Sequence, residues 1–238
     1  MVAGRELTSI AWRTVTTPAR SSYWLSATPF LAFLALTALV VASSTQSLDD
    51  GWLSLMEEYE VGWLVAVARA FHVIGSYPIA LVTSVAIGIA FIVLKKWWAL
   101  WAWVAIVGGA QVLSAVTKTL VDRPRPVDAL VFESSASYPS GHAMVSGAAM
   151  GIGVAVIAGF LWPRRHQLFL GLGFTYAVIM AWSRTYLRVH WLTDVVGGLL
   201  FGVAIVFAVV AVVSHRRGGH ATTTPSNGDG DNGTGAVG

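Results

Sequence analysis

The sequence predicts an all-α membrane protein, a polytopic bundle of six transmembrane helices with one extra interfacial helix. Of its 238 residues, 55% are hydrophobic and only 11% are charged, whereas soluble domains carry about 25% charged residues. The apolar residues are spread over most of the chain, which favours one membrane domain over two soluble ones. The net charge is +3, but the basic residues lie in short clusters at the ends of apolar runs. This pattern is typical of membrane topology and not of nucleic-acid binding.

Six apolar segments are long enough to cross a hydrocarbon core as helices, which takes about 20 residues each. The first segment is longer than the apolar core of a signal peptide, so we expect it to be retained as a span. A shorter stretch, 61–74, is interrupted by Arg69 and His72 and predicts an interfacial or re-entrant helix. The six expected spans lie in the segments 21–48, 73–94, 97–117, 143–163, 167–183 and 195–213.

One domain, 22–213, is expected to contain all of these spans. The segment 1–21 before it is predicted to be a cytosolic N-terminal segment. The segment 214–238 after it is rich in Gly, Thr, Asn and Asp and is predicted to be a disordered cytosolic tail. The chain has no cysteine, which excludes disulfides and thiolate chemistry.

Basic clusters predict the orientation in the membrane. Lys95 and Lys96 follow the second span, and Arg164 and Arg165 follow the fourth. By the positive-inside rule these loops and both termini are cytosolic. The loops 118–142 and 184–194 then lie on the extracytoplasmic side, and the setting we expect is a bacterial plasma membrane.

Three short segments on that outer side carry the residues that could bind or react with a substrate. A lysine and an arginine follow the third span, and a Pro-Ser-Gly-His segment precedes the fourth. A further arginine, a histidine and an aspartate lie between the fifth and sixth spans. Clustered arginines at a membrane boundary suit a phosphate group, since a guanidinium donates two hydrogen bonds at once. The residues are Lys118, Arg125, Ser140, Gly141, His142, Arg184, His190 and Asp194.

Local chemistry suggests a role for several of these residues. Ser140 and Gly141 lie where a helix begins, and backbone N–H groups there favour an anion. His190 and Asp194 are four residues apart, so on a helix they share one face, and the carboxylate can orient the imidazole for attack. His142 lies at the same level and is a candidate proton donor to a leaving oxygen.

These residues resemble the type 2 phosphatidic acid phosphatase superfamily, whose signature is K-x6-RP, PSGH and SR-x5-H-x3-D. All three motifs are complete here, in order, between residues 118 and 194. The resemblance implies that His190 is the nucleophile, oriented by Asp194, and that His142 is the general acid. It also implies that the phosphoryl oxygens are held by Lys118, Arg125, Ser140, Gly141 and Arg184.

The resemblance implies no cofactor and no metal, because fixed cations can stabilise the transition-state charge. The expected partners are a lipid phosphate substrate and the bilayer, with no nucleic acid and no obligate protein partner. Arg188 departs from the small residue expected at its position, and either contacts a second phosphate or faces lipid headgroups. Arg123 is open to the same two interpretations.

The expected substrate is a polyprenyl diphosphate of the undecaprenyl type, because the chain is small and its site faces outward beside apolar helices. Phosphatidylglycerophosphate and phosphatidic acid are the alternatives within the same class. A transporter, or a lipid-phosphate-binding protein without turnover, is the alternative of another class. The spans contain few ionisable groups, which argues against a transport path at mid-membrane.

Overall fold

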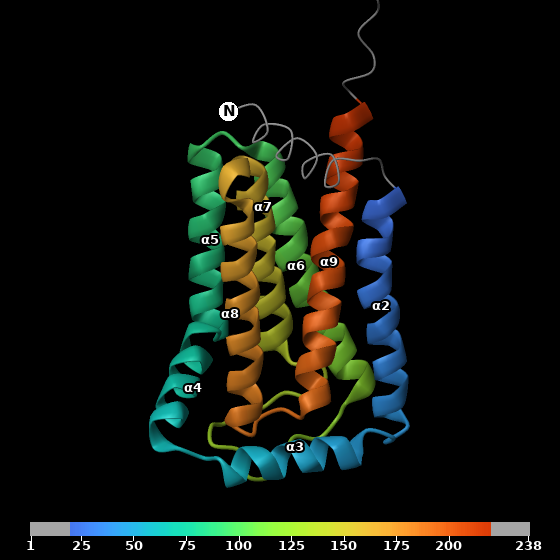
Figure 1. Ribbon diagram of the computed structural model, residues 1–238, viewed down its shortest axis with the longest axis vertical. Helices are drawn as coiled ribbons and strands as arrows, with labels where there is room; N and C mark the ends of the chain where they lie inside the picture. Colours follow the sequence, from blue (N-terminus) through green and yellow to red (C-terminus); the bar gives the residue numbers. More distant parts are fainter. Residues whose placement is uncertain (1–19, 220–238) are drawn as a thin grey trace, which may run out of the picture.

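The computed structural model describes residues 20–219, all of whose regular elements are helices (Figure 1). Long helices run side by side as a bundle, and a shorter helix lies across one end. The expected terminal segments fall largely on 1–19 and 220–238, outside the described residues. The helices are α2 (Arg20–Val41), α3 (Gln46–Glu58), α4 (Gly62–Ile74), α5 (Tyr77–Val93), α6 (Trp97–Val121), η1 (His142–Ile152), α7 (Gly153–Leu161), η2 (Pro163–Arg165), α8 (His166–Tyr186) and α9 (Leu192–Gly219).

Four helical stretches of the described chain are long and apolar enough to cross a membrane, and the bent pair α4–α5 makes a fifth. The fold is therefore an all-helical membrane fold with four or five candidate spans, fewer than the six expected. The difference is α8, which has 21 residues and runs along the bundle (Figure 1). Its polar residues, Arg184 among them, leave it less apolar than the other four.

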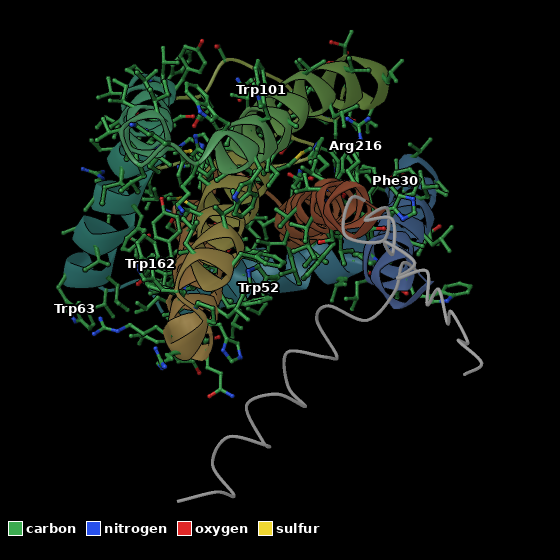
Figure 2. The ribbon with its side chains drawn as sticks, turned by 90° about the horizontal axis from the view of Figure 1, so that it is seen from above. Phe30, Trp52, Trp63, Trp101, Trp162 and Arg216 are labelled. Carbon is green, nitrogen blue, oxygen red and sulfur yellow. The ribbon has the colours of Figure 1, made fainter. Side chains whose placement is uncertain are left out.

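The exterior of the bundle is apolar, as expected for a surface that faces lipid. Trp63 and Trp101 are 67% and 69% exposed, and Phe30 is 40% exposed. Figure 2 shows Trp63 and Phe30 on opposite sides of the molecule. Since water would oppose so much exposed aromatic surface, this exterior identifies an integral membrane protein.

The end of the bundle that carries α3 differs from the prediction in one respect. The sequence predicted a single interfacial helix over 61–74, and that segment forms α4, which meets α5 at a bend of 57°. A second short helix, α3, arises from 46–58, part of which was assigned to the first span. Asp49, Asp50, Glu57 and Glu58 end the apolar run there, so the chain leaves the span direction and crosses the end of the bundle (Figure 1).

Small residues bring α9 against η1 at the centre of the bundle. A Cβ atom at Gly202 would lie 2.5 Å from Cβ of Ala148, and one at Gly198 would lie 2.7 Å from the carbonyl oxygen of Ser140. Such close approach is typical of membrane helices, which pack through small residues. It places the start of α9 directly beside the start of η1, where two of the three motifs end.

Candidate active site

The three motif segments meet at the end of the bundle beside α3 (Figure 1). Lys118 lies in the last turn of α6, and Arg184 lies in the last turn of α8. His142 is the first residue of η1, and Asp194 lies in the first turn of α9. Each of these helices therefore ends or begins at the same level, which brings segments far apart in the sequence into one site.

His190 and Asp194 form a buried pair. The Nδ1 atom of His190 lies 3.3 Å from Oδ2 of Asp194, and the two residues are 3% and 0% exposed. The carboxylate also accepts the backbone N–H of Trp191 at 3.0 Å and the hydroxyl of Ser137. The expectation that both residues share a helical face is wrong, because α9 begins only at Leu192. The turn before the helix brings the pair together instead.

The hydrogen bonds of His190 define its tautomer. Nη1 of Arg125 lies 3.2 Å from Nε2 of His190, and a guanidinium only donates, so Nε2 offers its lone pair. Nδ1 then carries the proton and donates to Asp194. Burial, and next the positive charges of Arg125, Arg184 and Lys118, hold the pKa of His190 well below its ordinary value near 6.5. The imidazole is therefore neutral at neutral pH, with Nε2 available as a nucleophile.

Lys118 and Arg125 are held beside this histidine by backbone oxygens of the loop that precedes η1. Lys118 donates to the carbonyl of Ala136. Arg125 donates from Nε to the carbonyl of Ser135 at 2.7 Å. Carbonyl partners fix both cations without neutralising them, so their charge remains available to an anion placed next to Nε2.

Arg184 is the third cation, and it is fully buried. Its Nη2 donates to Oε1 of Glu133 at 2.7 Å, and its Nη1 lies 2.7 Å from Nδ1 of His72. Because the guanidinium only donates, Nδ1 of His72 is an acceptor. Two partners thus fix the plane of the Arg184 guanidinium. The Nη2 group that donates to Glu133 could equally donate to a phosphate oxygen.

His142 is held against His72 through Nε2 of its ring. Nε2 of His142 lies 3.2 Å from the carbonyl oxygen of His72, which can only accept, so Nε2 carries a proton. The two rings stack at 5.4 Å with 17° between their planes. Nδ1 of His142 lies 3.9 Å from Oε1 of Glu133. Nδ1 is therefore the nitrogen left for proton exchange with a substrate.

Ser140 and Gly141 differ in how far the protein already engages them. The backbone N–H of Ser140 donates to the carbonyl of Asp194 at 3.0 Å, and its hydroxyl oxygen accepts the N–H of Ala143 at 3.4 Å. Only the Ser140 hydroxyl proton remains for a ligand. Within residues 20–219, no backbone bond engages the N–H of Gly141, and a Cβ there would lie 3.9 Å from Cε of Lys118. That N–H can still donate to a phosphate.

Sequence reasoning missed three residues of the site: His72, Glu133 and Ser137. His72 looked like an ordinary interfacial histidine, and Glu133 looked like one of several acidic residues in an outer loop. Neither lies within a recognisable motif, so only the packing of α4 and of the 126–139 loop against η1 identifies them.

The two ambiguous arginines both have protein partners. Arg188 pairs with Glu57 at 3.2 Å and with Glu60 at 2.9 Å. Arg123 pairs with Asp49 and Asp194, each at 2.7 Å. Both arginines join the end of the bundle to α3 or to the turn that follows it.

A cluster of possible metal ligands lies at the same site. Ligand atoms of His72, Glu133 and His142 all lie within 4.8 Å of one another. Arg184, however, already engages two of these three residues. The guanidinium takes the place that a metal cation would need, so the donor set fits an arginine-bound anion better than a metal ion.

Comparison with known proteins agrees with this geometry. The sequence model of the PAP2 superfamily matches residues 96–217, a range that contains all three motifs. The chain is 31% identical to phosphatidylglycerophosphatase B of Bacillus subtilis over 184 residues, covering 76% of this chain and 90% of that protein. It is 32% identical to an undecaprenyl-diphosphatase of Sulfolobus acidocaldarius over 99 residues, covering 42% of this chain and 41% of that protein.

The fold also matches a crystal structure. A transmembrane PAP2-type phosphatidylglycerolphosphate phosphatase from Bacillus subtilis superposes with a TM-score of 0.73 and 28% identity, covering 85% of this chain and 99% of that one. The family motifs, the membrane bundle and the converging site are thus found together in one molecule. The chain belongs to the PAP2 superfamily, as an integral membrane phosphatase.

Proposed function

We propose that this protein hydrolyses a lipid phosphate or diphosphate through a phosphohistidine formed on His190. The observation that carries the proposal is the environment of its Nε2 atom. Nε2 is unprotonated and faces Arg125, while Nδ1 faces the carboxylate of Asp194. A neutral nucleophile oriented by a carboxylate and surrounded by fixed cations suits attack on an anionic phosphorus.

The proposed reaction has two steps. In the first, Nε2 of His190 bonds to phosphorus and the bond from phosphorus to the leaving oxygen breaks. His142, protonated on Nδ1, transfers that proton to the leaving oxygen. In the second step His142 accepts a proton from water, whose oxygen attacks phosphorus. The bond between phosphorus and Nε2 breaks, which releases phosphate and restores both histidines.

The other site residues bind the phosphoryl oxygens in this scheme. Lys118, Arg125 and Arg184 supply charge, the Gly141 N–H supplies a backbone donor, and Ser140 supplies a hydroxyl donor. No step needs a metal ion, since these donors are already fixed before the substrate arrives.

His72 supports the acid side of the site. Its carbonyl is one of the last carbonyls of α4, which lack a partner within the helix, and it accepts Nε2–H of His142. The end of α4 thus fixes the ring of His142 and leaves its Nδ1 atom for the substrate.

We also propose six spans, with α8 as the one that falls short on hydropathy alone, and a site on the extracytoplasmic side. Lys95 lies between α5 and α6, and Arg164 lies in η2 between α7 and α8. Both junctions are at the end of the bundle opposite α3 (Figure 1). The positive-inside rule assigns that end, with both termini, to the cytosol. The site then lies at headgroup depth on the opposite face.

A lipid is the proposed substrate because the site lies where apolar helices end. A polyprenyl diphosphate is one candidate, supported by the likeness to an undecaprenyl-diphosphatase. Phosphatidylglycerophosphate is the second, supported by the likeness to phosphatidylglycerophosphatase B along most of both chains.

Phosphate release by the detergent-purified protein tests the proposal. A panel of undecaprenyl diphosphate, phosphatidylglycerophosphate and phosphatidic acid would be assayed with EDTA present. We expect release from at least one lipid, inhibition by vanadate, which mimics pentacoordinate phosphorus, and no release by His190→Ala. Binding without release from any lipid would favour a non-catalytic protein, and loss of activity in EDTA with rescue by magnesium would contradict the mechanism.

A further inference from the structure

A second buried charge network lies behind the catalytic pair, and the mechanism above does not use it. Its centre is Arg123, which is 9% exposed. Nη1 of Arg123 donates to Oδ1 of Asp194 at 2.7 Å. Nη2 donates to Oδ2 of Asp49 at 2.7 Å. Asp49 belongs to α3 and is 0% exposed, so Asp194 shares its cation with a carboxylate from a different element.

Asp49 also holds the first turn of α9. Its Oδ1 accepts the backbone N–H of Thr193 at 2.9 Å, and its Oδ2 accepts the Thr193 hydroxyl at 2.7 Å. The Thr193 hydroxyl in turn accepts Nη1–H of Arg123 at 2.8 Å. Because Thr193 immediately precedes Asp194, α3 fixes the backbone that carries the catalytic carboxylate as well as its counter-ion.

Such a network is costly unless it is fully paired, because buried charges lose their hydration. Both Nη atoms of Arg123 and all four carboxylate oxygens of Asp49 and Asp194 have partners, which indicates a fixed geometry. The Arg123 guanidinium balances part of the charge of Asp194. His190 therefore faces a partly neutralised carboxylate on one side and the cations of α6, of the loop after it and of α8 on the other: Lys118, Arg125 and Arg184.

We infer, on the basis of the phosphatase function proposed above, that Arg123 and Asp49 are positioning residues for the reaction. Arg123 holds Asp194 and moderates its charge, and Asp49 fixes both Arg123 and the turn that presents Asp194. Asp194 can then orient His190 without favouring protonation of the Nε2 atom of His190.

Two substitutions should shift the pH dependence in opposite directions. Arg123→Gln removes the cation that balances Asp194, so the His190–Asp194 pair should take up a proton more readily. The acid limb of the pH profile of kcat/KM should then move to higher pH by about one unit. A neighbouring charge shifts a pKa by about one to three units, and this is the lower end of that range. Asp49→Asn removes a negative charge and leaves Arg123 on Asp194, so the same limb should move to lower pH. A general loss of structure would not produce opposite shifts.

The measurement is phosphate release by the full-length protein in detergent, as a function of pH, relative to the wild type. Substrate ionisation is common to all variants, so the differences report the enzyme. For Arg123→Gln we expect kcat to fall about tenfold or more, as misplacing a catalytic group does, with KM near that of the wild type. Arg123→Lys keeps the charge and should return the acid limb toward its wild-type position.

Arg188→Gln is the matched control. It breaks ion pairs from the same 187–191 turn to Glu57 and Glu60, but Arg188 has no bond to Asp194 among the described contacts. Its pH profile should match the wild type. The inference is overturned if Arg188→Gln reproduces the shift, or if Arg123→Gln lowers activity without moving the limb. If Arg123→Gln does not fold, the pH profile of Asp49→Asn is the test. An acid limb that stays at the wild-type pH, or moves to higher pH, overturns the inference.

The same assay keeps the two proposals apart. Wild-type release that disappears in His190→Ala supports the phosphatase function whatever the Arg123 and Asp49 variants do. Absence of release by the wild type on every lipid tested would count against the phosphatase function, and with it this inference.

Discussion

At the scale of single residues, the two catalytic histidines are distinguished by their partners. His190 presents Nε2 to a guanidinium and Nδ1 to a carboxylate, so the one lone pair of Nε2 points to the place where Arg125 would bind a phosphate. His142 presents Nε2 to a carbonyl oxygen, which fixes a proton there and leaves Nδ1 for exchange. Hydrogen bonds that form without substrate therefore already distinguish the nucleophile from the acid.

The depressed pKa of His190 leads to a prediction about acid pH. A histidine attacks as the neutral imidazole, and burial with neighbouring cations holds the pKa of His190 well below 6.5. Lowering the pH through 6.5 should therefore leave the nucleophile unprotonated. We expect the enzyme's own acid limb in kcat/KM to lie below pH 6.5, after correction for phosphate ionisation measured by phosphorus NMR. A limb at or above 6.5 would show that the site does not depress this pKa.

His72 allows a test of how Arg184 is oriented. His72→Asn can keep an oxygen acceptor near the position of Nδ1, whereas His72→Leu leaves a buried guanidinium donor without its partner. We expect His72→Leu to lower kcat/KM about tenfold to hundredfold, since hydrogen bonds to charged groups contribute about 1.5–3 kcal/mol. His72→Asn should retain much of the wild-type value. Equal losses in both variants would mean that the Arg184 contact is unimportant.

At the scale of elements, the junction of α9 with η1 aligns the site. A Cβ at Gly198 would lie 2.7 Å from the carbonyl oxygen of Ser140 and 3.2 Å from the backbone nitrogen of Met144. These are backbone atoms and cannot rotate away. A methyl group here should therefore push the start of α9 away from the start of η1, and carry Asp194 with it.

Gly198→Ala should accordingly lose both stability and activity. Overpacking of this kind costs about 1–3 kcal/mol, which thermal unfolding in detergent can measure alongside phosphate release. Gly108→Ala is the control, because a Cβ at Gly108 meets nothing within 4 Å, and it should behave like the wild type. Wild-type activity in Gly198→Ala would show that the two helices do not set the site geometry.

The elements also show what a sequence can predict. Long uncharged runs placed α5, α6, the pair η1 and α7, α8 and α9 closely, because hydrophobicity over 20 residues is a strong signal. Helix α3 was missed because its first residues, Gln46 to Leu48, continue the uncharged run of the first span before the acidic residues appear. The role of Asp49 was invisible for a different reason: its partners Arg123 and Thr193 lie more than 70 residues away in the sequence.

The candidate site shows the same division. Its motif residues were found because their spacing matches the family motifs, and the structure brings them together. His72, Glu133 and Ser137 follow no spacing rule, and their positions depend on how α4 and the 126–139 loop pack. The expected helical pairing of His190 with Asp194 failed because four-residue spacing fits a tight turn as well as a helix.

At the scale of the whole molecule, the orientation in the membrane leads to a direct prediction. The chain has no cysteine, so single cysteines at Ala129 and Gly219 can be labelled with a membrane-impermeant reagent in intact cells. Ala129 lies in the exposed loop near the site, and Gly219 ends α9 at the opposite end. We expect labelling at 129 and not at 219. The reverse pattern would place the site in the cytosol.

The burst of phenol released from an aryl phosphate with an acidic leaving group tests directly whether His190 is the nucleophile. Such a leaving group needs no proton, so His142→Ala should still release phenol in the first step, while losing about 10²–10⁴-fold on a lipid alkoxide. His190→Ala should show no burst, because no phosphohistidine can form. A burst in His190→Ala with none in His142→Ala would contradict the assignment of His190 as the nucleophile.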